Sequence, residues 1–244
     1  MPQFFDLHCH MLAGADDGAK NAEEMFSMLE MAYEDGIRAI CLTPHYSPYL
    51  FGNNVLASER SYAELKEYVA EKHPDMQIFL GNELGYHQGC VNELVDGRCR
   101  TLNNSRYVLM DFSEGEDFFS LSMAVNQVQR AGYFVILAHA ERYRCLFHKF
   151  RWFESFVDEG GIIQINASSC CGGWGKPAER QCKKLLRHGL VHMISSDGHN
   201  LTTRQPKISV CMPYLERHFD EETIGRLVWE NARRVCSDGL ISAF

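Results

Sequence analysis

Short apolar segments alternate along the chain with longer segments whose apolar residues recur at a helical period. Apolar runs of this length, rich in Ile, Leu, Val and Phe, are typical of strands buried in a parallel sheet, and the amphipathic segments are typical of the helices that connect them. The predicted strands comprise residues 4–8, 37–43, 76–81, 106–112, 133–139, 161–166 and 191–197. The alternation therefore predicts an α/β protein built from successive βαβ units.

The predicted helices carry recognisable start and stop signals. In the first helix, Asn21 stands at the position of a helix cap, two glutamates follow in the first turn, and Gly36 comes after the last turn. Further helices are predicted at residues 58–74, 118–131, 147–158, 177–188 and 205–236. Because each predicted strand is followed by a helix or a helical insertion, the pattern favours a distorted (β/α)7 TIM-like barrel over an open doubly wound sheet.

Length and composition are those of one globular domain. The chain has 244 residues, of which 45% are hydrophobic and 23% charged, and it contains no low-complexity linker. We therefore expect a single domain over residues 1–244. No apolar run is long enough to cross a bilayer, and the first residues lack the basic and apolar regions of a secretory signal, so we expect a cytoplasmic protein without membrane insertion.

The charge balance argues against a nucleic-acid-binding protein. Twenty-four Lys and Arg residues face 32 Asp and Glu residues, which gives a net charge of -8, and the chain has no basic block. Proteins that bind nucleic acid neutralise phosphates with clustered basic side chains. A small or protein-borne substrate is the better expectation.

The ten cysteines do not form a recognisable redox or zinc motif. No C-x-x-C pair occurs, and several cysteines lie in apolar segments, so we expect reduced thiols that pack as small hydrophobic groups. Two pairs, Cys145 with Arg151 and Cys211 with Arg217, have the C-x5-R spacing of cysteine phosphatases. The residues between them are bulky and include no glycine, so a tight phosphate-binding loop is not expected.

Histidines and carboxylates follow the predicted strands at the points where they end. These residues are His8 and His10 on the first strand, then His45, Glu83, Asp111, His139, Asp197 and His199. In a parallel barrel the carboxyl ends of the strands meet on one face, which is where active sites form. We therefore expect these side chains to converge.

The donor types and their spacing predict a metal centre. His8 and His10 stand one residue apart, so on an extended strand both side chains point to the same side and can hold one ion. Imidazole with carboxylate suits Mn²⁺, Fe²⁺ or Zn²⁺, and the donors outnumber those that one ion takes, so two or three ions are expected. The glycine-rich loop after His10 lets Asp17 turn back to the centre, whereas Asp16 is expected in a solvated turn or a helix cap.

Two arginines stand beside the predicted centre. Arg142 follows His139 and Arg204 follows His199, so both can reach the same mouth. Guanidinium groups bind phosphate oxygens in bidentate fashion. Together with metal ions, which lower the pKa of bound water, they would suit hydrolysis of a phosphate ester.

Six motifs in order carry a resemblance to a known family. They read DLHCHMLAGADDG, TPHY, GNELGY, LNNSRYVLMDFS, AHAERY and SSDGHN. Their order and content resemble the PHP (polymerase and histidinol phosphatase) superfamily, and within it the manganese-dependent tyrosine phosphatases of bacterial capsule and exopolysaccharide operons. The resemblance covers nearly the whole chain.

The resemblance implies a ligand set and a substrate. In it, His8, His10, Glu83 and Asp197 hold the first ion, Glu83, Asp111 and His139 the second, and Asp17, His45 and His199 the third. Manganese is the implied metal, and iron or zinc is the alternative. The implied substrate is phosphotyrosine in the tail of a bacterial tyrosine autokinase that controls polysaccharide export.

The chain departs from the family pattern at two positions. Asp111 stands where relatives usually have a glutamate, so its carboxylate is one methylene shorter, and Ala13 replaces the usual proline before the loop glycine. The first departure bears on the geometry of the second ion. Neither removes a type of ligand.

The hypothesis from sequence is a metal-dependent phosphoric monoester hydrolase, in which metal-activated hydroxide attacks phosphorus and Arg142 and Arg204 clamp the phosphate. Alternatives are a phosphatase for a small phosphate ester such as histidinol phosphate, and a noncatalytic module stabilised by metal. Amidohydrolases also use an H-x-H pair and a last-strand aspartate, but they commonly carry a carboxylated lysine where Glu83 or Asp111 stands here.

Overall fold

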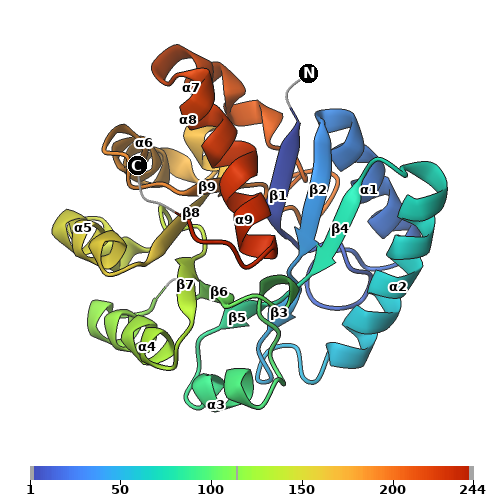
Figure 1. The fold of residues 1–244 in the computed structure, drawn as a ribbon, viewed down its shortest axis with the longest axis horizontal. Helices are drawn as coiled ribbons and strands as arrows, with labels where there is room; N and C mark the ends of the chain where they lie inside the picture. The colour runs from blue at the N-terminus through green and yellow to red at the C-terminus, as the bar shows by residue number, and fades with distance from the viewer. Residues whose placement is uncertain (1–2, 114, 242–244) are drawn as a thin grey trace.

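Nine parallel strands form the centre of the molecule and helices surround them, as the computed structural model shows for residues 3–113 and 115–241 (Figure 1). The strands are β1 (Phe4–Cys9), β2 (Ile37–Leu42), β3 (His45–Tyr46), β4 (Gln77–Leu80), β5 (Glu83–Gly85), β6 (Tyr107–Asp111), β7 (Phe134–Leu137), β8 (Ile162–Asn166) and β9 (Met193–Ser195). They pair in the orders β1-β2-β4 and β3-β5-β6-β7-β8-β9, always in parallel. The predicted α/β fold with parallel strands is confirmed.

Two of the predicted strands are followed by a short continuation that the sequence did not reveal. β3 comes two residues after β2, and β5 comes two residues after β4. Pro44, in the first gap, has no N–H to donate to a ladder. Asn82, in the second gap, donates its side-chain amide to the Pro44 carbonyl over 2.9 Å. The same carbonyl accepts from the N–H of Glu83 over 3.2 Å, and pairing resumes between His45 and Glu83.

The first and last strands also meet. The backbone N–H of Asp197 donates to the His8 carbonyl over 2.9 Å, and that of His10 donates to the Gly198 carbonyl over 2.8 Å. Cys9 and Gly198 form an isolated parallel bridge at the same place. The carboxyl ends of β1 and β9 are thus joined by backbone hydrogen bonds, at the place where the candidate ligands lie.

The main helices are those predicted from the periodicity. They are α1 (Ala22–Asp35), α2 (Val55–Lys72), α4 (Phe118–Arg130), α5 (Phe150–Asp158) and α6 (Gly175–Arg187), with a short α3 (Cys90–Val95) in addition. Asn21 caps α1 as predicted, because its side chain accepts a hydrogen bond from the N–H of Glu24 over 2.9 Å. Gly36 ends α1 in a left-handed conformation, with φ of 101°.

The helical tail predicted over residues 205–236 is mostly helical, but it is not one continuous helix. The structure has three helices there, α7 (Met212–His218), α8 (Glu221–Gly225) and α9 (Asn231–Cys236), with a π-helical segment at Arg226–Glu230. Phe219 has an extended backbone, and Asp220 then caps α8 by accepting from the N–H of Thr223. Asp220 competes with the helix for backbone hydrogen bonds, so a new helix starts.

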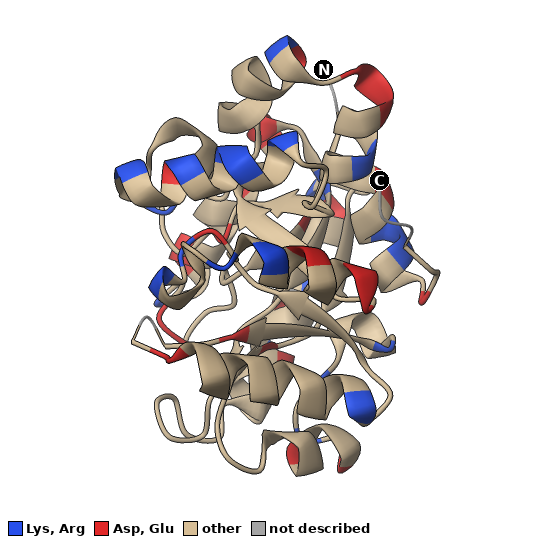
Figure 2. Cartoon of the chain, turned by 90° about the vertical axis from the view of Figure 1, so that its left-hand side faces the viewer, with Lys and Arg blue, Asp and Glu red and all other residues tan. Residues whose placement is uncertain are grey.

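Two hydrophobic cores hold the strands and helices together. The larger one packs the strands against the outer helices, and the smaller one joins inward residues such as Leu7, Leu109 and Ile136 to Val235 of α9. In Figure 1, α9 lies across the strands at the centre of the molecule. Charged residues lie mostly on the helices and loops, with both signs interspersed (Figure 2). Among the described residues, no helix combines the length and apolarity that crossing a membrane requires.

The inward face of the strands changes from apolar to polar along their length. On β6, Tyr107 and Leu109 belong to the inner core, and Asp111, two residues further on the same face, reaches the candidate site. On β1 the pairing with β2 shifts register between Asp6 and Cys9. Such an irregularity re-aims side chains, which allows Leu7 to face the core and His8 to face the site.

Buried His192 predicts a pH-dependent stability. It lies just before β9, Nδ1 accepts a hydrogen bond from the N–H of Ile163, and burial lowers its pKa to about 4. The unfolded chain takes up this proton below about 6.5, so the free energy of unfolding should fall by up to about 3 kcal/mol as pH falls from 6.5 to 4. H192N keeps an acceptor and should remove this part of the slope in denaturant titrations of metal-free protein.

H148N, which replaces an exposed histidine, is the control for this measurement. Its free energy of unfolding should depend on pH as that of the unmodified chain does. An H192N protein with the same loss of stability between pH 6.5 and 4 would contradict the assignment to His192.

Candidate metal centre

The structure brings together all nine predicted metal ligands and both predicted arginines. The ligands are His8 and His10 on β1 and the residue after it, Asp17 in the following loop, His45 on β3, Glu83 on β5, Asp111 on β6, His139 after β7, and Asp197 and His199 after β9. Each is held at the carboxyl end of a strand or in the loop beyond it. This is the placement that the sequence predicted.

Glu83 lies at the middle of the cluster. Its Oε2 lies 3.2 Å from His8 Nε2, 3.1 Å from His10 Nε2 and 3.0 Å from His45 Nδ1, and its Oε1 lies 3.0 Å from His139 Nε2. Burial alone would raise the pKa of Glu83, but the charges of His8 and His45 hold it well below its usual range. The carboxylate is therefore ionised although it is fully buried.

Asp197 connects the imidazoles to the two arginines. Its Oδ1 lies 3.5 Å from His8 Nε2 and accepts a hydrogen bond from Arg204 over 2.8 Å, and its Oδ2 lies 3.4 Å from the Arg142 guanidinium. Asn166, the last residue of β8, donates its side-chain amide to Oδ2 over 2.8 Å. Burial opposes ionisation, but His8 and Arg204 keep the pKa of Asp197 well below its usual range.

Two of the ligands have a backbone conformation that is uncommon outside glycine. Asp197 has φ of 54° and His139 has φ of 31°. Left-handed residues of this kind cost conformational free energy and concentrate at functional sites. The surrounding structure supports His139 through a 2.7 Å hydrogen bond from its N–H to Gln164 Oε1.

The adjacent aspartates of the first loop have different roles. Asp17 is half-exposed, and its Oδ1 lies 3.5 Å from His199 Nε2 and 3.6 Å from His45 Nε2; the adjacent imidazole of His199 lowers the pKa of Asp17. The expectation that Asp16 is solvated is wrong, although its Oδ1 does accept from the N–H of Gly18 over 3.0 Å in a local turn. Its side chain is buried and accepts from His10 Nδ1 over 2.7 Å and from the N–H of His45 over 2.8 Å.

Asp16 is thus an orienting partner for a candidate ligand. The pKa of Asp16 lies below its usual value because the opposing effect of burial is outweighed by the nearby His10. A carboxylate on Nδ1 fixes the imidazole so that Nε2 faces the centre, as is usual for metal-bound histidines. In the sequence, the only signal for this role of Asp16 is that it stands directly before Asp17. Two adjacent aspartates do not reveal which of them contacts His10.

Other supporting residues lie one layer behind the ligands. Gln164 Oε1 lies 3.3 Å from His8 Nδ1, in addition to accepting from the backbone of His139. Glu141 is fully buried and accepts from the N–H of Asn166 and from the Ser169 hydroxyl. Gln164 was missed because a single glutamine inside an apolar strand gives no signal of its own.

The donor atoms fit divalent ions. Three groups of candidate ligand atoms lie within 4.8 Å of one another: His10, Asp17, His45 and His199; His8, His10 and Asp197; and His45, Glu83 and Asp111. The Nε2 atoms of His8 and His10 face each other at 2.9 Å. Glu83 Oε2 is buried and has no aligned hydrogen bond among the described residues, although three imidazole nitrogens surround it. These residues would hold a divalent cation, which would satisfy the buried oxygen and the facing imidazole nitrogens.

A cavity of about 240 Å³ opens on this cluster. It is lined by Asp17, His45, Glu83, Asp111, Phe112, Ser113, His139, Arg142, Tyr143 and Arg204. The Tyr143 hydroxyl donates to Asp111 Oδ1 over 3.0 Å, which fixes the carboxylate that replaces the usual glutamate. Burial and the neighbouring Glu83 raise the pKa of Asp111.

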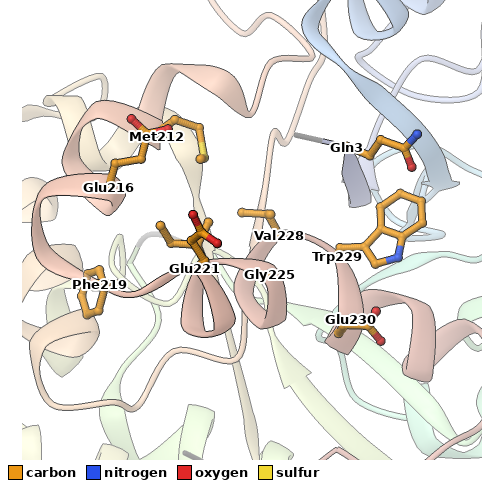
Figure 3. A pocket seen from close by; sticks show the side chains of 10 residues that line it. Gln3, Met212, Glu216, Phe219, Glu221, Gly225, Val228, Trp229 and Glu230 are labelled. Atoms are coloured by element: carbon orange, nitrogen blue, oxygen red, sulfur yellow. The ribbon is translucent and has the colours of Figure 1, made fainter. Parts of the chain in front are cut away.

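A larger cavity lies elsewhere. It has a volume of about 730 Å³ and lies beside Gln3, at the amino end of β1, with Met212, Glu221 and Trp229 among its lining residues (Figure 3). None of the predicted ligands lines it. Volume therefore does not identify the site, whereas convergent titratable side chains do.

The two C-x5-R pairs take no part in the candidate centre. Neither Cys145 nor Cys211 lines its cavity. Burial raises the pKa of Cys145, and a hydrogen bond with Cys170 together with burial raises that of Cys211. A thiol that is harder to ionise is a poor nucleophile, which agrees with the prediction that no cysteine phosphatase loop forms here.

Fold and donor set together define a class: β/α proteins that gather histidines and carboxylates around a cavity at the carboxyl ends of parallel strands. Within this class the assignment is specific. The family model described as capsular polysaccharide synthesis, CpsB/CapC, matches residues 4–237, and the chain belongs to that family. The resemblance drawn from the six motifs is confirmed.

Named relatives span almost the whole chain. The tyrosine-protein phosphatase CpsB of Streptococcus agalactiae is 28% identical over 241 residues, which cover 97% of this chain and 99% of the relative. The tyrosine-protein phosphatase YwqE of Bacillus subtilis is 27% identical over 227 residues, covering 93% and 89%.

Solved structures agree with these matches. A structure from work on YwqE of Bacillus subtilis and CpsB of Streptococcus pneumoniae, described as metal-dependent tyrosine phosphatases, superposes with a TM-score of 0.88 and 26% identity, covering 98% of this chain and 97% of that one. The phosphotriesterase homology protein of Escherichia coli gives a TM-score of 0.57 at 14% identity, covering 95% and 98%, which shows a shared fold alone.

Replacing Asp16 should weaken metal binding without removing a ligand. In D16N the charged acceptor on His10 Nδ1 is lost, and losses of this kind lower metal affinity by about 10–100-fold. Competition titrations of Mn²⁺ and Zn²⁺ against a chromogenic chelator measure the change. D158N, an exposed aspartate at the end of α5, is the matched control. Equal affinities in D16N and D158N would show that Asp16 does not orient a ligand.

Proposed function

We propose that the chain is a metal-dependent tyrosine-protein phosphatase, as its CpsB and YwqE relatives are named. One observation carries the proposal: two guanidinium groups, those of Arg142 and Arg204, line the same small cavity as five of the histidine and carboxylate donors. Donors alone would suit many hydrolases. The added pair of arginines suits a substrate with a dianionic phosphate group.

We further propose that all nine donors are ligands, and that two or three ions bind, with manganese expected and iron or zinc as alternatives. The proposed sets are His8, His10, Glu83 and Asp197; Glu83, Asp111 and His139; and Asp17, His45 and His199. The clusters of donor atoms support the first and third sets closely. In the second, His45 rather than His139 lies with Glu83 and Asp111, and His139 is 3.5 Å from Asp111 Oδ1.

When bound, such ions supply Lewis-acid polarisation of the phosphoryl group and a water of lowered pKa. The residues of the chain supply the rest. Arg142 and Arg204, which both contact Asp197, can turn toward equatorial phosphate oxygens and offset the charge that develops on them. Asp197 and Glu83 stay ionised and keep the neighbouring imidazoles in place. A phenolate leaving group needs little help from an acid.

The finer points of substrate and context belong to the same proposal. The substrate would be a phosphotyrosine-bearing protein, namely the tail of a tyrosine autokinase in capsule or exopolysaccharide regulation, and the site of action the cytoplasm. We propose one domain over residues 1–244 with a (β/α)7 barrel. In this count β2 with β3, and β4 with β5, are each one strand interrupted at Pro44 or Asn82.

Metal removal should abolish hydrolysis, and reconstitution should restore it. After chelation, elemental analysis should show loss of transition metal together with loss of phosphatase activity, and Mn²⁺, Fe²⁺ or Zn²⁺ are then added back separately. H45A should lose most of the restored activity, at least about 100-fold in kcat. C145S is the matched control, because Cys145 lies outside the cavity. Activity of the metal-free protein equal to that of the loaded protein would refute the proposal.

Substrate class is tested by comparing kcat/KM for a phosphotyrosine peptide and for histidinol phosphate under the same metal loading. The peptide should be the better substrate. A large preference for histidinol phosphate would replace the proposed function with that of a small-metabolite phosphatase. If neither is hydrolysed while chelation lowers Tm, the module is structural.

A further inference from the structure

A second cavity adjoins the candidate metal centre. It has a volume of about 200 Å³ and is lined by Arg142, Arg144, Phe147, Trp174, Pro177 and Ala178. Arg142 lines both this cavity and the one at the metal centre. The two cavities are therefore neighbours that share one guanidinium group.

Trp174 lies against both arginines of the candidate centre. The Arg142 guanidinium carbon lies 3.7 Å from the centroid of the Trp174 ring, and that of Arg204 lies 5.4 Å from it. Stacking on an indole face stabilises a cation and restricts its orientation. Trp174 is thus placed to position both guanidinium groups, and its ring also lines the second cavity.

The loop that carries Trp174 depends on the glycines on either side of the tryptophan. Gly172 and Gly175 have positive φ, 84° and 83°. A side chain at Gly173 would meet Ser168 at 2.9 Å. Glycines on both sides of the tryptophan let the chain fold tightly before α6, which presents the indole to the arginines.

The lining of the second cavity has a distinct chemistry. It combines two guanidinium groups with the apolar surfaces of Phe147, Trp174 and Pro177, and no carboxylate is among its lining residues. The chain as a whole carries a net charge of -8, so this cavity is cationic on an acidic protein. Its chemistry matches a side chain with a short apolar stem and a terminal carboxylate.

We propose that the second cavity is a subsite for an acidic residue next to the phosphotyrosine of a protein substrate. This inference rests on the proposed phosphatase function. Arg144, which is exposed, pairs with the carboxylate, and Phe147 and Trp174 pack against the stem. Neighbouring residues of an extended peptide lie about 3.4 Å apart along the chain, so a residue one or two places from the phosphotyrosine reaches an adjoining cavity.

Two peptides that differ only in charge test the subsite. Both contain one phosphotyrosine, flanked by glutamates in one peptide and by glutamines in the other, and kcat/KM is measured with Mn²⁺-loaded protein at low ionic strength. The unmodified chain should prefer the glutamate peptide about fivefold, the upper end for one exposed ion pair. The preference should shrink at high salt.

Matched arginine variants assign the preference to this cavity. R144Q should bring the ratio of the two kcat/KM values close to one, whereas R151Q, at an exposed arginine of α5 outside the cavity, should keep it. An unmodified chain without a preference, a preference for glutamine, or an R144Q protein that keeps the full ratio would overturn the subsite alone. If free phosphotyrosine and both peptides all resist hydrolysis, the proposed function and the subsite fall together.

Discussion

The structure depends on the neutralisation of buried carboxylate charge at the carboxyl ends of the strands. An ionised Glu83 without partners would cost several kcal/mol to bury. It is balanced by imidazoles that come from separate strands, His8 on β1, His45 on β3 and His139 after β7. A slip in strand register would remove at least one of these contacts. The charges and the pairing of His45 with Glu83 therefore fix each other.

This polar end is possible because the other end of the strands is apolar. Inward residues such as Leu7 and Leu109 pack against Val235 of α9, so the amino half supplies hydrophobic stabilisation. The irregular pairing of β1 then turns His8 toward the centre. The inner face of the same strands thus carries both the apolar core and the candidate site.

The sequence predicted the parts of this arrangement that follow from strand periodicity. Apolar runs located the strands, and the donors followed because they stand where those runs end. Asp16 was misjudged because its burial depends on His10 and on the N–H of His45, which belongs to a distant part of the chain. The stacking of Trp174 on Arg142 was also beyond prediction, because it depends on how a glycine loop folds in three dimensions.

Asp197 links the proposed metal ligands to the two arginines. One of its oxygens lies near His8 and His199 and also accepts from Arg204, while the other contacts Arg142 and Asn166. The carboxylate is thus shared between the imidazoles and the two guanidinium groups. The left-handed backbone of Asp197, with φ of 54°, holds the carboxylate between the two sets of partners. The positions of the arginines and of the imidazoles are therefore fixed by the same side chain.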